Sequence, residues 1–205
     1  MSTTLIAKGS EGSKFPKLEA GLYNAVCYAV VDLGLQHNKV YDKYSQQIAI
    51  LFELTDEQIE VNGRRENRTI SGIYTNSISD KSNLRKILEG WRGRAFTPEE
   101  LEGFDLEKLL GLPCMVNVID DTGSNGNTYS KIGSVSKLPK GHGPIEGMQE
   151  PFIFELIDEK SLIHMQSLPE WIQKKIKESK TYEEISGRSA GEGFSEIPSD
   201  DDLPF

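Results

Sequence analysis

Alternation of apolar and polar residues along the chain predicts five β-strands, which cover residues 22–33, 44–54, 68–74, 113–119 and 128–138. In the first strand most odd-numbered positions are apolar, and interleaved apolar residues near 27–29 predict a bulge. The second strand is expected to face the core with its even-numbered side chains. The turn pair Asn62-Gly63 predicts that strands two and three form one long hairpin.

The hydrophobic spacing changes to the helical period between strands three and four. An amphipathic helix is expected to begin after Ser79 or Ser82. Its buried face has i, i+3, i+4, i+7 spacing and consists of Leu84, Ile87, Leu88 and Trp91. Residues 97–100 have the order of a capping box with proline at the first helical position, and Asp105 can cap a third short helical turn. The insertion 79–111 is therefore predicted to be helical.

The remaining segments are an arm, a connector and a tail. Residues 1–16 are polar and lack periodicity, which favours a flexible N-terminal arm. An edge strand is expected at 152–157 and a helix at 169–179, with proline in its first turn. Residues 181–205 are expected to form a disordered acidic tail.

The order of these elements is that of one known architecture. Three strands, a helical segment and a hairpin of two more strands make up the OB-fold, a five-stranded, partly open barrel that binds oligonucleotides. We therefore expect a mainly β protein with helical insertions, whose OB-fold domain covers residues 17–180 and ends in a C-terminal helix.

Length and cysteine usage limit the classes of protein. The 205 residues suffice for one globular domain and are too few for two of full size. We find no run of roughly 20 apolar residues and no signal-peptide pattern, so a cytoplasmic protein is expected. Cys27 and Cys114 both lie in apolar strands, which predicts buried thiols rather than a disulfide or a zinc site.

The charge is uneven. A net charge of −9 would by itself argue against a nucleic-acid partner. The last 28 residues, however, carry −6 of it, and the preceding 177 residues carry only −3. The body of the protein can therefore hold a basic surface, while the acidity belongs to the tail.

The chain ends in a motif with its own chemistry. Three aspartates and the terminal carboxylate of Asp200, Asp201, Asp202, Leu203, Pro204 and Phe205 can attract a basic surface, and Phe205 can fill an apolar pocket. A plain solubilising tail rarely ends in Leu-Pro-Phe. In these six residues the chain resembles the single-stranded DNA-binding proteins of bacteria and phages. Segments 81–86, 91–94 and 168–172 and the long insertion resemble the phage members more than the bacterial ones.

This resemblance implies a protein of phage DNA replication and recombination in the cytoplasm of a bacterial host. It would coat single-stranded DNA without sequence specificity and recruit replication and recombination proteins through its C-terminal tip. The sequence leaves open whether the protein acts as a homodimer. It also leaves open a recombination mediator or annealing protein, and an adaptor whose barrel binds protein instead of DNA.

Single strands are held by cations that contact phosphates and by aromatic rings that stack on bases. Such residues gather in the first loop, in the second hairpin, in the insertion and along the last hairpin. The candidate DNA-binding residues are Lys39, Tyr41, Lys43, Tyr44, Arg64, Arg65, Arg68, Tyr74, Arg92, Arg94, Tyr129, Lys131, Lys137 and Lys140. Arg85 and Lys86 add positive charge to the insertion, whereas the helical spacing of Trp91 favours a core position.

Enzyme motifs are weak or missing. The chain has no P-loop, and its one G-x-S-x-G match, at 187–191, lies in the polar tail with no histidine after it. None of the three histidines has a metal-binding partner at helical spacing. Asp120 and Asp121 could hold Mg²⁺ with Glu155 or Glu159, but they precede a plain turn. We therefore expect no enzymatic activity, no cofactor and no metal.

Overall fold

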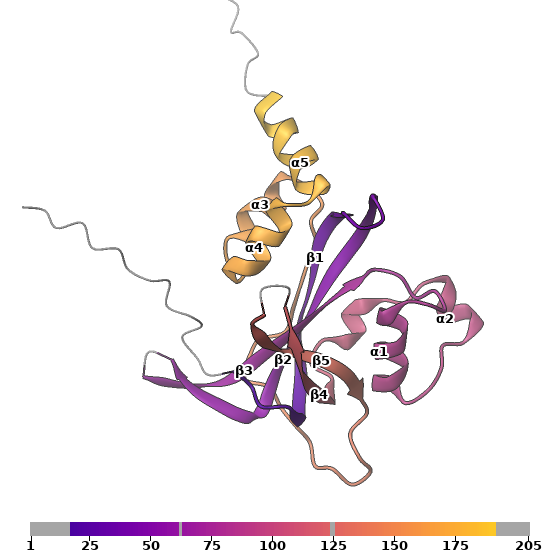
Figure 1. Ribbon diagram of the computed structural model, residues 1–205, viewed down its shortest axis with the longest axis vertical. Helices are drawn as coiled ribbons and strands as arrows, with labels where there is room; N and C mark the ends of the chain where they lie inside the picture. The colour runs from indigo at the N-terminus through magenta and orange to yellow at the C-terminus, as the bar shows by residue number, and fades with distance from the viewer. Residues whose placement is uncertain (1–16, 62, 124–125, 192–205) are drawn as a thin grey trace, which may run out of the picture.

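The computed structural model describes residues 17–61, 63–123 and 126–191, and these form one curled β-sheet with helices on both of its faces (Figure 1). The predicted arm at 1–16 and the tip Asp200–Phe205 lie outside the described residues. The strands are β1 (Gly21–Asn38), β2 (Lys43–Val61), β3 (Arg64–Thr75), β4 (Pro113–Thr122), β5 (Thr128–Ser136) and β6 (Phe152–Phe154). The helices are α1 (Asn83–Arg92), α2 (Pro98–Glu102), the 3₁₀-helix η1 (Leu106–Leu109), α3 (Glu159–Met165), α4 (Glu170–Lys177) and α5 (Lys180–Gly191).

The sheet is an open half-barrel. Its strand order is β3-β2-β1-β4-β5, with antiparallel neighbours, and β6 adds to β1 in parallel. Within the described residues no ladder joins β3 to β5, so the sheet does not close there. The mainly β class and the helical segment between the third and fourth strands are confirmed.

Local signals in the sequence match the structure closely. Val61 pairs with Arg64 across a two-residue turn, which confirms the β2–β3 hairpin. The Ser82 side chain accepts a hydrogen bond from the backbone N–H of Arg85 and so caps α1. Thr97 and Glu100 form the predicted capping box of α2.

The predicted bulge is present and has a larger effect than expected. The register of β1 against β2 shifts between Cys27 and Ala29, and there β1 exchanges its other neighbour, β4, for β6. One inserted residue turns later side chains to the opposite face. As a result Ala25 and Cys27 face one core, whereas Val31 and Leu33 face another.

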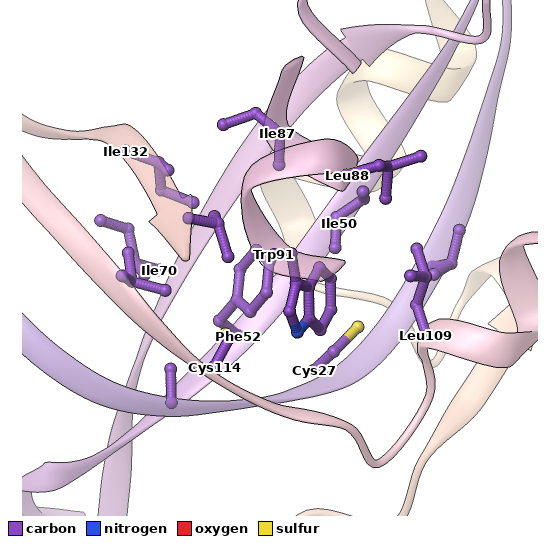
Figure 2. Close-up of a cluster of buried hydrophobic side chains, with 14 of the residues drawn as sticks. Cys27, Ile50, Phe52, Ile70, Ile87, Leu88, Trp91, Leu109, Cys114 and Ile132 are labelled. Atoms are coloured by element: carbon purple, nitrogen blue, oxygen red, sulfur yellow. The ribbon is translucent and has the colours of Figure 1, made fainter. Parts of the chain in front are cut away.

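The first core lies between the curled sheet and the α1 insertion. The ring centroids of Trp91 and Phe52 are 5.3 Å apart, and Figure 2 shows the indole beside Cys27 and Ile50. The Trp91 indole N–H donates to the carbonyl oxygen of Pro113 at 3.1 Å. Trp91 is 4% exposed, which confirms its predicted core position. Both thiols, on Cys27 and Cys114, are also buried, and burial raises the pKa of Cys27 to about 12.

A second core, on the opposite face, was not predicted. The odd-numbered residues of β2, Ala49 and Leu51, are buried beneath α4, whose Ile172 and Ile176 are fully buried. The prediction that the even-numbered residues of β2 face the core is confirmed, since Ile48, Ile50, Phe52 and Leu54 are buried in the first core. The C-terminal helices bury the other face of β2 as well. Gln36 fastens these helices, since its side-chain amide donates to the carbonyl oxygen of Lys175 at 2.8 Å.

The predicted disorder is wrong for residues 181–191, and the rest of the predicted tail lies outside the described residues. Instead of disorder from residue 181, helix α5 continues to Gly191. Two contacts hold its first turns on β1: the backbone N–H of Leu35 donates to the Thr181 hydroxyl at 2.9 Å, and Ile185 is buried in the second core. Helix α3 was also missed, while the predicted edge strand and the helix after Pro169 are present as β6 and α4.

A buried carboxylate holds the long connector between β5 and β6 against the sheet. Glu53 is 0% exposed and accepts hydrogen bonds from the Asn67 side chain at 3.1 Å and from the backbone N–H of Met148 at 2.8 Å. The Gln149 N–H donates to it at 3.2 Å. A Cβ at Gly147 would lie 1.8 Å from the Glu53 carboxylate, so only glycine fits there.

We predict that Glu53→Ala lowers the free energy of unfolding by about 2–5 kcal/mol, because it leaves buried N–H donors without an acceptor. In the same variant, the backbone amides of Met148 and Gln149 should exchange hydrogen faster than in the wild type. Glu60→Ala, on the exposed part of the same strand, should change neither quantity. A Glu53→Ala variant that unfolds like the wild type would contradict this role.

Candidate nucleic-acid interface

A deep hollow lies where the half-barrel stays open. A cleft of about 590 Å³ runs between β3 and β5, and the first turns of α1 border it. Its lining residues are Ser71, Gly72, Ile73 and Tyr74 from β3, Asn83, Lys86 and Ile87 from α1, and Tyr129, Ser130, Lys131, Ile132 and Gly133 from β5. We call this hollow the β3–β5 cleft.

Packing of α1 holds the cleft in shape. Leu84, Ile87 and Leu88 bury one side of the helix in the first core, which leaves Asn83 and Lys86 toward the cleft. At its other end α1 is tied to the chain just after β5, because the backbone N–H of Lys137 donates to the Gly90 carbonyl oxygen at 3.2 Å. The helix therefore sits between the two end strands.

A second hollow continues the cleft past the end of β3. It has a volume of about 390 Å³, shares Ile73, Tyr74 and Asn83 with the cleft, and adds Lys81 and Gln47. Among the described residues, no acid lines either hollow. Three lysines, two tyrosines and several amide and hydroxyl groups thus face one continuous concave surface, which suits an anionic polymer with flat rings.

The β5 side of the cleft presents a tyrosine and a lysine that share one anchor. Lys131 Nζ lies 2.9 Å from Asp121 Oδ2, and the Tyr129 hydroxyl donates to the same oxygen at 3.2 Å. The hydrogen bond from Lys131 lowers the pKa of Asp121, and in turn raises the pKa of the lysine. Asp121 therefore fixes the direction of both side chains while half of the Tyr129 ring stays exposed.

The β3 side of the cleft presents Tyr74, whose ring packs over Gly72 of the same strand. A Cβ on Gly72 would lie 2.3 Å from the Tyr74 hydroxyl, so the glycine makes room for the ring. Burial raises the pKa of Tyr74 to about 12. The phenol is accordingly neutral at physiological pH and adds no negative charge to the cleft.

Two predicted arginines are engaged elsewhere. Arg92 pairs with Glu100 and lies over the rings of Phe96 and Phe104, at 4.4 and 5.2 Å from their centroids. Arg94 makes a two-pronged contact with the same carboxylate, at 2.7 and 2.9 Å. These arginines hold the α1–α2 insertion together.

The other candidates are spread over the molecule. Lys39, Tyr41, Lys43 and Tyr44 lie at the β1–β2 turn, where Lys180 of α5 sits 5.5 Å from the Tyr44 ring centroid. Arg64, Arg65 and Arg68 lie along the start of β3. Lys137 lines a separate hollow of about 190 Å³ with Arg92 and Trp91, and Lys140 is exposed in the connector. Of the predicted residues, Tyr74, Tyr129 and Lys131 meet in the cleft.

The DNA-binding residues predicted from the sequence did not include several residues that line the cleft or the hollow beside it. Lys81 precedes α1, Asn83 is its first residue, and Ile73 is 44% exposed on β3. Lys86 was noted only as charge in the insertion. Its spacing puts it on the exposed side of the helix, away from Leu84 and Ile87, so the sequence held no signal that it would line the cleft.

The acid pair considered for Mg²⁺ binds lysines instead. Asp120 lies 2.7 Å from Lys17 Nζ, and Asp121 holds Lys131. No three His, Cys, Asp or Glu side chains gather as a metal site in the part of the chain that the structure describes. The same residues include no helix long and apolar enough to cross a membrane.

Comparisons with known proteins give no family. No protein-family model matches the chain, and a search of curated proteins finds no significant similarity. Inference about function therefore depends on the residues themselves.

The ion pairs of Glu100 give a test of the insertion. The hydrogen bond from Arg94 is the largest cause that lowers the pKa of Glu100, to about 2. Because the folded pKa lies below the ordinary 4.5, the carboxylate stabilises the fold above pH 4.5 and loses this contribution as the pH falls toward 2.

We predict that Glu100 titrates near pH 2 when followed by NMR, and that Arg94→Ala moves its pKa upward. Lys108→Ala, on the neighbouring η1, should leave the Glu100 titration unchanged. A wild-type Glu100 that titrates like a free carboxyl would contradict the observed pairing.

Proposed function

We propose that this chain is a non-enzymatic single-stranded DNA-binding protein of a phage replication and recombination module. The observation that carries the proposal is the cleft between β3 and β5 with the hollow beside it, where Lys81, Lys86 and Lys131 lie around two tyrosines. The described lining residues include no acid, and the nearby Asp121 pairs with Lys131. Phosphates of a strand would contact the lysines, and bases would stack on the exposed ring of Tyr129. Contacts of this kind do not depend on base identity, so binding is sequence-tolerant.

The strand connections support an OB-fold of unusual openness. Strands β1, β2 and β3 form a meander, and β4 and β5 return as a hairpin beside β1, as in an OB barrel. The element that a closed barrel would add is a ladder between β3 and β5. We infer that the cleft occupies this position and that α1 fills the base of the opening.

The C-terminal tip supports the same function from the sequence. The acidic Asp200–Asp202 run and Phe205 have the composition of a partner-binding segment that combines charge with an apolar anchor. Such a segment would bring replication and recombination proteins to DNA coated by the sheet domain.

Salt dependence tests the cleft directly. Phosphate contacts on single strands give a slope of about −0.7 per contact in log K against log salt. We predict that the double variant Lys86→Ala/Lys131→Ala weakens all single-stranded oligonucleotides about tenfold at low salt and makes this slope shallower. Affinities can be measured by fluorescence anisotropy at two salt concentrations.

The matched control is Lys108→Ala/Lys160→Ala, which removes the same charge from exposed sites outside the cleft. It should bind like the wild type. A wild type with no affinity for single strands at low salt would refute the proposal and favour the protein adaptor. A wild type that also pairs complementary strands would favour the annealing protein.

The tail gives a second prediction. Removal of Asp200–Phe205 should raise affinity for single strands modestly at low salt and negligibly at physiological salt, because the Debye length there is about 8 Å. Phe205→Ala should leave DNA affinity unchanged and abolish capture of replication proteins from a host lysate, since it removes the anchor and keeps every charge. If both variants retain partner capture, the tail is only a solubiliser.

A further inference from the structure

The two tryptophans of the chain have opposite environments. Trp91 is buried in the first core, whereas Trp171 is 42% exposed in the first turn of α4. The neighbouring Ile172 is fully buried in the second core, so α4 cannot rotate to hide the indole. A rigidly mounted, half-exposed indole next to a hollow is typical of a stacking or recognition surface.

The hollow beside Trp171 is small and shaped by three strands. Its volume is about 170 Å³, and it is lined by Trp171 and Pro169 from the helix side and by Tyr28, Leu51, Thr69, Ile70 and Ser71 from the sheet. Small-molecule sites span roughly 300–1,000 Å³, so this one suits a single ring of a larger ligand. Burial raises the pKa of Tyr28 to about 12, which keeps its phenol neutral.

This hollow adjoins the β3–β5 cleft along β3. Ser71 lines both of them, with Thr69 and Ile70 on the Trp171 side and Gly72 to Tyr74 on the cleft side. The two hollows lie on opposite faces of the sheet, because α1 borders the cleft and α4 borders the hollow beside Trp171. A bound strand must therefore pass round the edge of β3 to fill both. Within the described residues β3 pairs only with β2, so its outer edge lies open between them.

Helix α4 carries positive charge after Trp171, although Lys175 lies 3.5 Å from Glu178. Lys174 is exposed one helical turn after Trp171, and α4 carries Lys175 and Lys177 in its last turn. A chain of phosphates that crosses the edge of β3 would therefore meet cations beyond the indole as well as before it. This continuity favours a nucleic-acid strand over an apolar peptide as the occupant.

We propose that Trp171 is a second base-stacking site, at which a nucleotide of single-stranded DNA inserts beside Pro169 and Tyr28 after the strand leaves the β3–β5 cleft. The inference rests on the proposed function, which it deepens by giving the bound strand a direction across β3. Short strands fill the cleft alone, and longer strands reach the indole.

Intrinsic fluorescence of the full chain tests this, because Trp91 is shielded and Trp171 is the accessible emitter. Oligothymidylates of about 4 and about 16 nucleotides, the range of site sizes known for OB-folds, are titrated into the protein. The longer strand should quench the emission and the shorter one should not. Trp171→Phe should abolish the quenching, and Trp171→Ala should weaken the longer strand by roughly 5- to 100-fold and leave the shorter one unchanged.

Ile163→Ala on α3 is the matched control, since it removes another exposed apolar side chain from the same helical layer and should alter no binding. Thermal melting shows whether each variant is folded. If Trp171→Ala unfolds, Trp171→Phe replaces it in the test, because it keeps an aromatic ring on α4 and should retain most of the affinity for the longer strand. This inference is overturned if long strands bind tightly without quenching, or if they bind Trp171→Ala as tightly as the wild type. Either result leaves the proposal of DNA binding in the β3–β5 cleft standing. Absence of any binding overturns the proposed function itself.

Discussion

Burial of the β1–β2 pair on both faces is the constraint on which the rest of the structure depends. The bulge at Cys27–Ala29 divides β1, so that Ala25 and Cys27 pack under the α1 insertion while Val31 and Leu33 pack under the C-terminal helices. The two layers oppose each other across one pair of strands (Figure 1). Each layer covers one face of this pair, and neither closes the end of the sheet between β3 and β5, where the cleft lies.

Polar contacts hold three segments in place on the sheet and its helices: the β5–β6 connector, helix α4 and the α1–α2 insertion. Glu53 holds the connector, Gln36 holds α4, and the Glu100 carboxylate draws Arg92 and Arg94 into the insertion. The last of these decides which cations remain available at the surface. With those two arginines committed, the basic character of the concave face comes from lysines on α1, on β5 and in the loop before α1.

Local chemistry made much of the fold predictable from the sequence. Ser82, Thr97 and the turn pair at 62–63 each act on neighbouring residues, and the two helix starts and the hairpin were placed correctly. The strands of the hairpin were predicted too short, since β2 continues past residue 54 to Val61 and β3 begins at Arg64 instead of Arg68. Helices α3 and α5 were missed because they are short or polar, and contacts with distant residues such as Leu35 stabilise α5. The site was only partly predictable, since Tyr74, Lys86 and Lys131 lie far apart in sequence and meet because the sheet curls.

The central claim is that single-stranded DNA lies in the cleft between β3 and β5. Photocrosslinking of the full chain to an oligonucleotide that carries 5-iodouracil, followed by peptide mass spectrometry, tests it most directly. The account predicts crosslinks in the β5 peptide with Tyr129 and the β3 peptide with Tyr74, and their loss in high salt. Crosslinks confined to the β1–β2 turn at 39–44 or to the hairpin at 64–68 would contradict it.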